Sequence, residues 1–184
     1  MKHTAVSLLL LLIPASAPAA DLTARQLLDL LDKNMVFQTR VSDARMSITK
    51  DGKTTEKQLH IQSKGYDTAF VDFLAPPRDK GTRYLKLDKN LWMYLPGAEK
   101  QVKISGHMLR QSLMGSDFSY EDMLESPDLS GRYEPTIAGE EPVDGVPCIV
   151  LDLKAKVPEI TYPERKVWID KERYVPMKAE LYAP

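Results

Sequence analysis

Few side chains in this sequence have the type and spacing that catalysis requires. Serine hydroxyls are concentrated between residues 105 and 119, close to His107, and would be the first candidates for a nucleophile. No Gly-x-Ser-x-Gly turn surrounds any of them, and His107 has no obvious nucleophile beside it. His60 falls between Leu59 and Ile61 in an alternating pattern, which predicts a side chain that faces solvent. We therefore expect no catalytic residue and no enzyme activity, and a lipid hydrolase is the least supported function.

The acidic residues and the cysteine also favour structural roles. Asp117, Glu121 and Asp122 lie near a predicted helix start, where carboxylates act as caps and as partners of the helix dipole. The Cys and His residues lack the spacing of a zinc site, and no glycine-rich phosphate loop is present. Cys148 is the only cysteine, and its strand-like surroundings predict a small buried hydrophobic side chain. The sequence thus predicts no metal and no cofactor.

The stretch from Pro76 to Leu124 contains the most distinctive local patterns. Three strand-like runs, Arg83–Leu87, Leu91–Leu95 and Gln101–Ile104, are each bounded by turn residues. The following run, His107–Met114, is apolar without alternating, and Gly115 ends it. This order predicts a meander of strands that leads directly into an apolar helical insert.

The insert at 107–124 has features of a movable lid. Ser119 can cap a second short helix, with Asp122 as the carboxylate three residues later. Gly106 and Gly115 flank the first helix and are candidate hinges. Of the seven methionines after residue 20, four lie in or beside the insert, and methionine adapts to varied apolar partners. The alternative is that these four residues only fill gaps in the core: Met93, Met108, Met114 and Met123.

The rest of the chain predicts short antiparallel strands behind one N-terminal helix. Leu22–Phe37 has an amphipathic pattern with Thr23 as its cap. Alternation from Ala44 to Thr49, the Asp51-Gly52 turn and the alternating run Val175–Tyr182 are typical of hairpin-linked strands. The alternation predicts Val167 and Ile169 on one face of their strand and Trp168 on the other, and it predicts four inward side chains in the last strand: Val175, Met177, Ala179 and Leu181. We expect an α+β fold: a single curved antiparallel sheet of about ten strands, forming a half-open β-barrel, with a helix and a short helical lid on the concave face. Two modest helices cannot fill such a barrel, so an apolar cavity is predicted.

The N-terminal residues predict export from the cytoplasm. Residues 1–20 contain Lys2, an apolar run too short to span a bilayer and a small-residue cleavage pattern, as expected of a signal peptide. No cysteine follows that would accept a lipid, so we expect a periplasmic protein without a lipid anchor. Residues 21–184 would form one domain with 24 basic and 26 acidic side chains. This weakly acidic balance argues against binding to nucleic acid or to an anionic membrane surface.

Two motifs resemble a known family. The runs are KGTRYLKLDKNLWMYLPGAEKQVKIS and SLMGSDFSYEDM. They are similar to the outer-membrane lipoprotein-sorting family, whose members are LolA-like periplasmic carriers. The resemblance extends from about Leu22 to the end of the chain. It implies a monomeric lipid- or lipoprotein-binding domain at 21–184. Family members continue with further strands, so either the domain is truncated at Pro184 or its sheet closes differently.

The resemblance implies a carrier that binds acyl chains of lipoproteins or other lipids for transfer toward the outer membrane. Its partners would be an inner-membrane donor and an outer-membrane acceptor. The alternative is a LolA-like sensor or interaction domain that regulates a membrane partner. The side chains expected to line or cover the lipid cavity come from the meander and the insert: Trp92, Tyr94, Met108, Leu109, Leu113, Met114 and Phe118.

Overall fold

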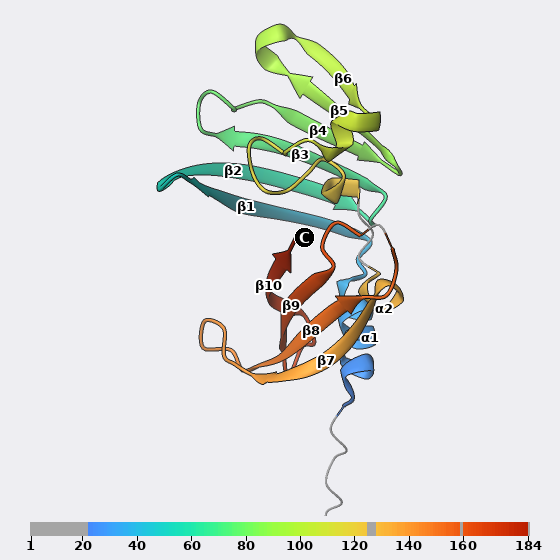
Figure 1. Cartoon of the computed structure of the whole chain (residues 1–184). Coiled ribbons are helices and arrows are strands. Elements are labelled where there is room, and N and C mark those ends of the chain that lie inside the picture. Colours follow the sequence, from blue (N-terminus) through green and yellow to red (C-terminus); the bar gives the residue numbers. More distant parts are fainter. Residues whose placement is uncertain (1–21, 125–127, 159, 184) are drawn as a thin grey trace, which may run out of the picture.

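The structure, a computed structural model, describes residues 22–124, 128–158 and 160–183. The predicted signal peptide at 1–20 lies outside the described residues. Within them, ten strands form two antiparallel sheets, accompanied by two α-helices and three short 3-10 helices (Figure 1). None of the described helices has the length and apolar character needed to cross a membrane.

The first sheet has six strands, each paired with its neighbour in sequence. Asp51 and Gly52 connect the two longest strands, and both have positive φ angles, 51° and 71°, as a tight hairpin turn requires. Every connection within this sheet is a hairpin, so the predicted meander is confirmed. Its strands are β1 (Thr39–Lys50), β2 (Lys53–Lys64), β3 (Thr68–Ala75), β4 (Arg83–Leu87), β5 (Asn90–Leu95) and β6 (Lys100–Ile104).

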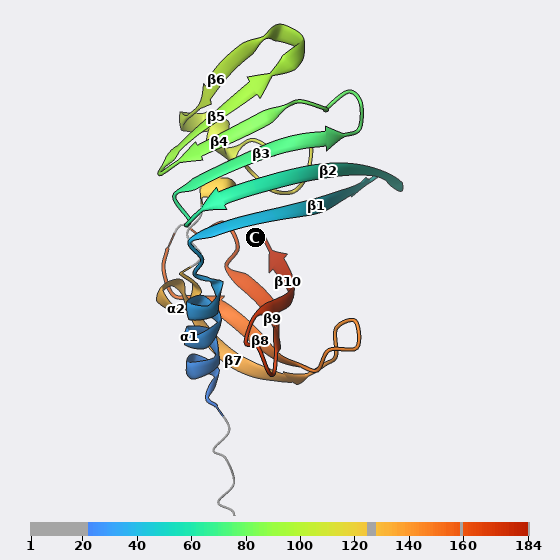
Figure 2. The same ribbon diagram turned by 180° about the vertical axis from the view of Figure 1, so that it is seen from behind.

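The second sheet has four strands in the order β10-β9-β8-β7. They are β7 (Tyr133–Glu140), β8 (Cys148–Ala155), β9 (Glu164–Asp170) and β10 (Pro176–Tyr182). In both ribbon views β10 is the strand of this sheet that lies nearest to β1 (Figures 1 and 2). No backbone pairing joins these two edge strands in the described residues. The predicted open curved sheet with helices is confirmed, with its ten strands divided into a six-stranded and a four-stranded part.

Helix α1 (Ala24–Met35) covers one face of the four-stranded sheet. Thr23 caps it through a reciprocal capping box with Gln26, as the sequence predicts for the cap. Its apolar stripe, Leu27, Leu28 and Leu31, is at most 1% exposed. The stripe packs against residues of the sheet's inner face, which are Tyr133, Leu151, Leu153, Val167 and Ile169.

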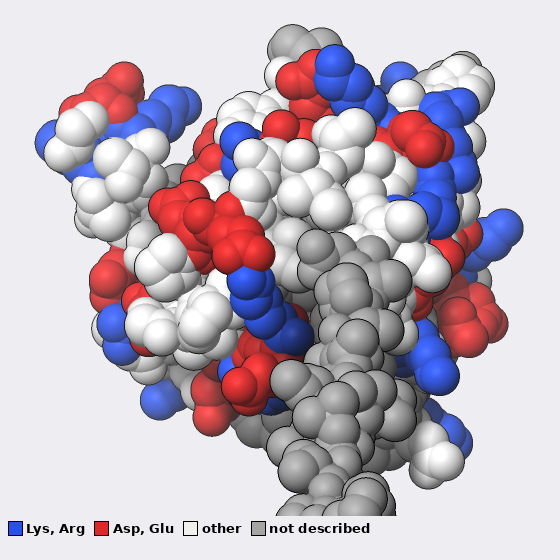
Figure 3. All heavy atoms as spheres, turned by 90° about the horizontal axis from the view of Figure 1, so that it is seen from below, with Lys and Arg blue, Asp and Glu red and all other residues white. Residues whose placement is uncertain are grey.

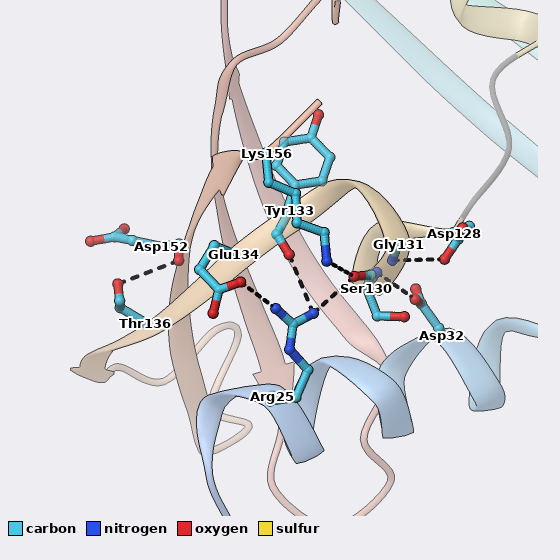
Figure 4. A network of polar contacts seen from close by, with 10 residues as sticks. All are labelled: Arg25, Asp32, Asp128, Ser130, Gly131, Tyr133, Glu134, Thr136, Asp152 and Lys156. Carbon is cyan, nitrogen blue, oxygen red and sulfur yellow. Dashed lines mark hydrogen bonds and ion pairs between the residues drawn. The ribbon is translucent and has the colours of Figure 1, made fainter. Parts of the chain in front are cut away.

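Polar contacts fasten α1 to the start of the four-stranded sheet (Figure 4). The Arg25 guanidinium donates to the carbonyl oxygen of Ser130 at 2.8 Å and forms an ion pair with Glu134 at 2.6 Å. The Asp32 carboxylate accepts from the backbone N–H of Ser130 at 2.7 Å, at the beginning of the short helix α2 (Leu129–Arg132). These bonds, added to the apolar packing, fix the helix against the sheet.

The insert after β6 covers the six-stranded sheet, but with 3-10 turns where the sequence predicts longer helices. It contains η2 (Gly106–Arg110) and η3 (Asp122–Leu124), and a backbone bridge links Ser112 to Ser119. Met114 and Gly115 both have positive φ angles, 53° and 85°, which end any helix at that point. The third 3-10 helix, η1 (Pro96–Ala98), connects β5 to β6.

The insert and the inner face of the six-stranded sheet form one apolar core. Its buried members from the strands are Leu59, Val71, Phe73, Tyr84, Leu91 and Ile104, and from the insert Leu113 and Tyr120. Because these side chains already fill the space beneath the insert, the predicted cavity does not lie there in this structure.

Candidate functional site

An apolar cleft lies between the two sheets. Its volume is about 350 Å³, near the lower end of the range for small-molecule sites. Helix α1, strands β9 and β10 and the start of β1 supply its walls. The apolar lining residues are Leu31, Met35, Leu129, Val167, Pro176, Ala179 and Leu181, and the polar ones are Asp32, Arg40, Tyr66, Asp122 and Arg165.

A second apolar cavity of about 190 Å³ adjoins the cleft. Asp122 and Leu181 line both spaces, so the two are neighbours at the boundary between β10 and the insert. The other lining residues of the smaller cavity are Leu113, Phe118, Ser119, Met123 and Tyr162. A long apolar ligand would therefore find apolar side chains from α1 to the insert, with the Asp122 carboxylate at the boundary between the two spaces.

Alternation along β10 directs its apolar side chains into this cleft. Ala179 and Leu181 line it, while Lys178 contacts the Trp168 ring on the opposite face, with its Nζ atom 4.1 Å from the ring centroid. The sequence also predicts Met177 on the inner side. That interpretation is wrong, because a bulge between Pro176 and Lys178 shifts the register and Met177 packs against the cluster of Cys148, Val150 and Trp168.

Aromatic and charged side chains surround one end of the cleft. The Arg40 guanidinium lies 4.6 Å from the centroid of the Phe37 ring, and Phe37 meets Tyr66 edge-on at 5.1 Å. The Tyr66 hydroxyl donates to the carbonyl oxygen of Met35 in α1. Burial is the main cause that raises the pKa of Tyr66. The positive charge of Arg40 opposes the increase, and the negative charge of Asp32 adds to it. At neutral pH this phenol is protonated and uncharged, and Arg40 beside it is an exposed cation.

One carboxylate ties the insert to the second sheet. Asp122 accepts from the backbone N–H of Ser119 at 2.7 Å, and Ser119 Oγ accepts from the backbone N–H of Asp122 at 3.2 Å, which confirms the predicted cap. The same carboxylate accepts from the Tyr162 hydroxyl at 2.8 Å. The Tyr133 hydroxyl in turn donates to the carbonyl oxygen of Tyr162 at 2.8 Å. The cleft's boundary is thus held by a short chain of hydrogen bonds.

A buried polar cluster is formed by residues of β2, of β4 and of the loop between β3 and β4. Lys57, 2% exposed, forms an ion pair with Asp79. The Tyr84 hydroxyl is buried and has no hydrogen-bond partner among the described residues. Burial, followed by the neighbouring Tyr120 and Asp79, raises the pKa of Tyr84. A protonated phenol beside a paired lysine has neither the charge nor the free lone pair of an activated nucleophile or base.

The structure separates the seven predicted site residues into three groups: two line the smaller cavity, three pack in the core of the six-stranded sheet, and two lie on the outer face of that sheet. Leu113 and Phe118 line the smaller cavity, with Leu113 7% and Phe118 43% exposed. Met108, Leu109 and Met114 pack against the core of the six-stranded sheet. Gly106 and Gly115, the proposed hinges, have φ angles of 57° and 85°, and their role in opening stays a prediction.

Trp92 and Tyr94 do not face the insert, which corrects the expected common cavity. On β5, Leu91 and Met93 belong to the inner core, so Trp92 and Tyr94 point to the outer face of the sheet. There they line a separate groove of about 390 Å³. Both faces of β5 carry large apolar side chains, so the strand pattern does not decide which face is covered, and only the position of the insert shows it.

Sequence reasoning missed most of the inter-sheet cleft. Arg40 comes from the start of β1 and Tyr66 from the turn between β2 and β3, whereas Val167 and Leu181 come from the second sheet. The sequence signals for this surface were the inward alternation of Ala179 and Leu181 and the apolar stripe of the N-terminal helix. Nothing in the sequence indicated that β10 would face β1.

Comparison with known proteins places this architecture in a family. A family model described as that of an uncharacterized protein matches residues 65–184, and no curated protein matches the chain. A DUF1329 family protein from Desulfovibrio piger is 30% identical, with a TM-score of 0.67 over 87% of this chain and 72% of that chain.

Two further solved structures share the fold. A putative outer-membrane lipoprotein-sorting protein domain from Vibrio parahaemolyticus is 22% identical, with a TM-score of 0.62 over 85% of this chain and 71% of that chain. A LolA superfamily protein from Nitrosomonas europaea is 24% identical, with a TM-score of 0.56 over 89% of this chain and 73% of that chain. The family model and the 30% identical relative show that the chain belongs to the DUF1329 family, and its fold is shared with the lipoprotein-sorting domain and the LolA superfamily protein.

Proposed function

We propose that this protein is a periplasmic carrier that binds acyl chains of lipoproteins or other lipids and moves them toward the outer membrane. The observation that carries the proposal is the apolar cleft between the two sheets, together with the adjoining cavity between the insert and β10. Flexible, unbranched side chains such as Met35 and Met123 line it and can adapt to ligands of different length.

The arrangement of charge supports an amphipathic ligand. Most of the lining is apolar, whereas Arg40 lies exposed at one end, next to the Phe37 and Tyr66 rings. An acyl chain could occupy the apolar space while a polar or anionic head remains beside the guanidinium. The fold shared with a lipoprotein-sorting domain and a LolA superfamily protein supports the same ligand class.

Two other functions remain as outcomes of the test. An interaction domain of the same fold would recognise a membrane protein and leave the cleft empty. A lipid hydrolase would require a nucleophile and a base, and the buried Tyr84 and Lys57 cluster offers neither in an accessible position. We infer that the protein is not an enzyme.

A fluorescent fatty-acid probe tests the cleft directly. Leu181→Asp should weaken probe binding at least about tenfold, because an unpaired carboxylate in an apolar site costs several kcal/mol. Tyr182→Asp is the matched control, since Tyr182 is 46% exposed and its hydroxyl bonds to Glu180 on the opposite face of β10. Both variants should retain the circular dichroism spectrum of the unmodified protein.

Native mass spectrometry of protein purified from periplasm adds an independent measurement. Copurified lipid or lipopeptide that is lost from Leu181→Asp and kept by Tyr182→Asp would support the carrier. Equal probe affinity in both folded variants would remove the cleft as the binding site. A protein that binds no acyl ligand at all would favour the interaction domain.

A further inference from the structure

The outer face of β4–β6 carries a groove that the proposed carrier function does not use. Cross-strand neighbours form its floor: Phe70 lies opposite Leu85, and Leu85 lies opposite Trp92. These side chains are only half-buried, and Leu87 at the edge is 40% exposed. The insert covers the opposite face of the same strands, so no described element packs over this one.

Cations lie directly beside the aromatic rings of this groove. The Lys103 ammonium is 5.6 Å from the centroid of the Trp92 ring, and the Arg83 guanidinium is 6.0 Å from that of the Tyr94 ring. Arg83 is partly neutralised by Asp72 at 3.5 Å, whereas Lys103 is exposed and has no ion pair in the described residues. We call this surface the basic groove: Phe70, Arg83, Leu85, Leu87, Trp92, Tyr94, Gln101 and Lys103.

The charge of the chain is unevenly distributed around this surface. Residues 80–110 include seven Lys or Arg and two acidic side chains, whereas residues 111–184 include eight basic and fifteen acidic ones. The weakly acidic total therefore conceals a basic balance in the segment that contains β4–β6. Of these seven cations, Arg83 and Lys103 lie at the groove, whereas Lys86 is buried and Arg110 belongs to the insert. The end of the molecule near α1 differs, because Figure 3 shows both signs intermixed there.

We propose that the basic groove docks onto the surface of a bilayer that contains anionic phospholipid. Tryptophan and tyrosine rings flanked by Lys or Arg are the side chains that settle at the level of lipid headgroups. Each basic residue near an anionic bilayer strengthens the attraction of the protein to that bilayer. Because salt limits this attraction to a short range, the charge close to the bilayer matters more than the total charge of the protein. A shallow apolar groove with a cationic rim matches the boundary between headgroups and acyl chains.

This inference goes beyond the carrier function, because docking uses the outer face and acyl binding uses the cleft. The two surfaces are on opposite sides of the six-stranded sheet, so a docked molecule would keep its insert free to move. Ligand could then be exchanged with the membrane while the protein is held at its surface. An acidic protein surface is the competing partner, and vesicles of defined lipid distinguish the two.

Sedimentation with vesicles tests the charge requirement. The protein should bind vesicles of phosphatidylglycerol and phosphatidylcholine at low salt and not vesicles of phosphatidylcholine alone. Lys103→Glu should weaken this binding at least about tenfold. Arg45→Glu is the matched control, because Arg45 is an exposed cation on the outer face of the same sheet, at β1 and distant from β4–β6. It should bind nearly as well as the unmodified protein.

Tryptophan fluorescence tests the orientation. The chain has two tryptophans, and Trp168 is 4% exposed in the other sheet, so bilayer-dependent changes should come from Trp92. Brominated phosphatidylcholine, mixed with phosphatidylglycerol, should quench the emission of the unmodified protein and not that of Trp92→Phe.

The outcomes separate this inference from the carrier. Absence of binding to anionic vesicles, equal loss in Lys103→Glu and Arg45→Glu, or quenching that persists in Trp92→Phe would each overturn it. Lys103→Glu should leave binding of the fatty-acid probe in solution unchanged. Failure of probe binding without failure of vesicle binding would reject the carrier and leave docking intact.

Discussion

At the scale of single residues, Asp170 shows how one carboxylate organises a turn. It ends β9 and accepts from the backbone N–H groups of Glu172 at 2.8 Å and Arg173 at 3.0 Å, and from Arg173 Nε at 2.6 Å. The N–H of Arg173, then that of Glu172, lower the pKa of Asp170. The turn holds the β9–β10 hairpin that supplies one wall of the cleft.

The lowered pKa predicts a pH-dependent contribution to stability. A carboxylate whose pKa is lower in the folded state stabilises the fold above the ordinary aspartate value, and loses this effect as pH falls toward the lowered value. Asp170→Asn keeps the shape but removes the charge, so it should be less stable at pH 7, with a difference that shrinks in acid. Urea denaturation between pH 7 and pH 3 measures this. Asp144→Asn, in the exposed β7–β8 turn, serves as control, and a difference that stays constant with pH would contradict the assignment.

At the scale of elements, the insert is held at its two ends by different means. Its first half packs apolar side chains on the six-stranded sheet, whereas its last turn, η3, is tied by the Tyr162–Asp122 hydrogen bond. Segments with few regular backbone hydrogen bonds open more easily than strands. We therefore expect the insert to be the most readily opened part of the core around the cleft.

Tyr162→Phe should loosen η3 and the adjoining half of the insert. A hydrogen bond to a carboxylate contributes about 1.5–3 kcal/mol, so amide exchange over 119–124 should be faster by about tenfold or more. Hydrogen exchange with mass spectrometry measures this, with the strands β2 and β3 as internal references. Tyr182→Phe is the matched control, since it removes an exposed hydroxyl bond to Glu180. Unchanged exchange in Tyr162→Phe would mean that apolar packing alone holds the insert.

At the scale of the whole molecule, the division into two sheets creates the cleft. A fully paired sheet would bring β1 and β10 into hydrogen-bonding distance and reduce the space between Arg40 and Leu181. In this structure the two edge strands face each other without pairing, and apolar side chains remain accessible between them. Binding of a ligand across this opening should couple the two sheets.

That coupling predicts stabilisation by the ligand. A ligand that binds only the folded state at about one hundred times its Kd adds about 2.7 kcal/mol to the free energy of unfolding. A fatty acid at such a concentration should raise the Tm of the unmodified protein and of Tyr182→Asp, and raise that of Leu181→Asp much less. A rise of equal size in all three proteins would place the ligand outside the cleft.

The local sequence determined the elements and most of their faces. Thr23 and Gln26 defined the start of α1, Asp51-Gly52 defined the first hairpin, and alternation assigned Val167 and Trp168 to opposite faces of β9. These features depend on residues close together in the chain, so propensity and periodicity are sufficient to predict them. The burial of Cys148 and the cap formed by Ser119 and Asp122 followed for the same reason.

Only the tertiary structure decided how these elements surround a site. The bulge that moved Met177 to the outer face depends on pairing with β9, and the face of Trp92 depends on where the insert packs. The cleft itself depends on β1 and β10, which lie more than 120 residues apart and meet without hydrogen bonds. Contacts between segments so distant in sequence leave no periodic pattern in either one, which is why the sequence predicted a cavity but not its walls.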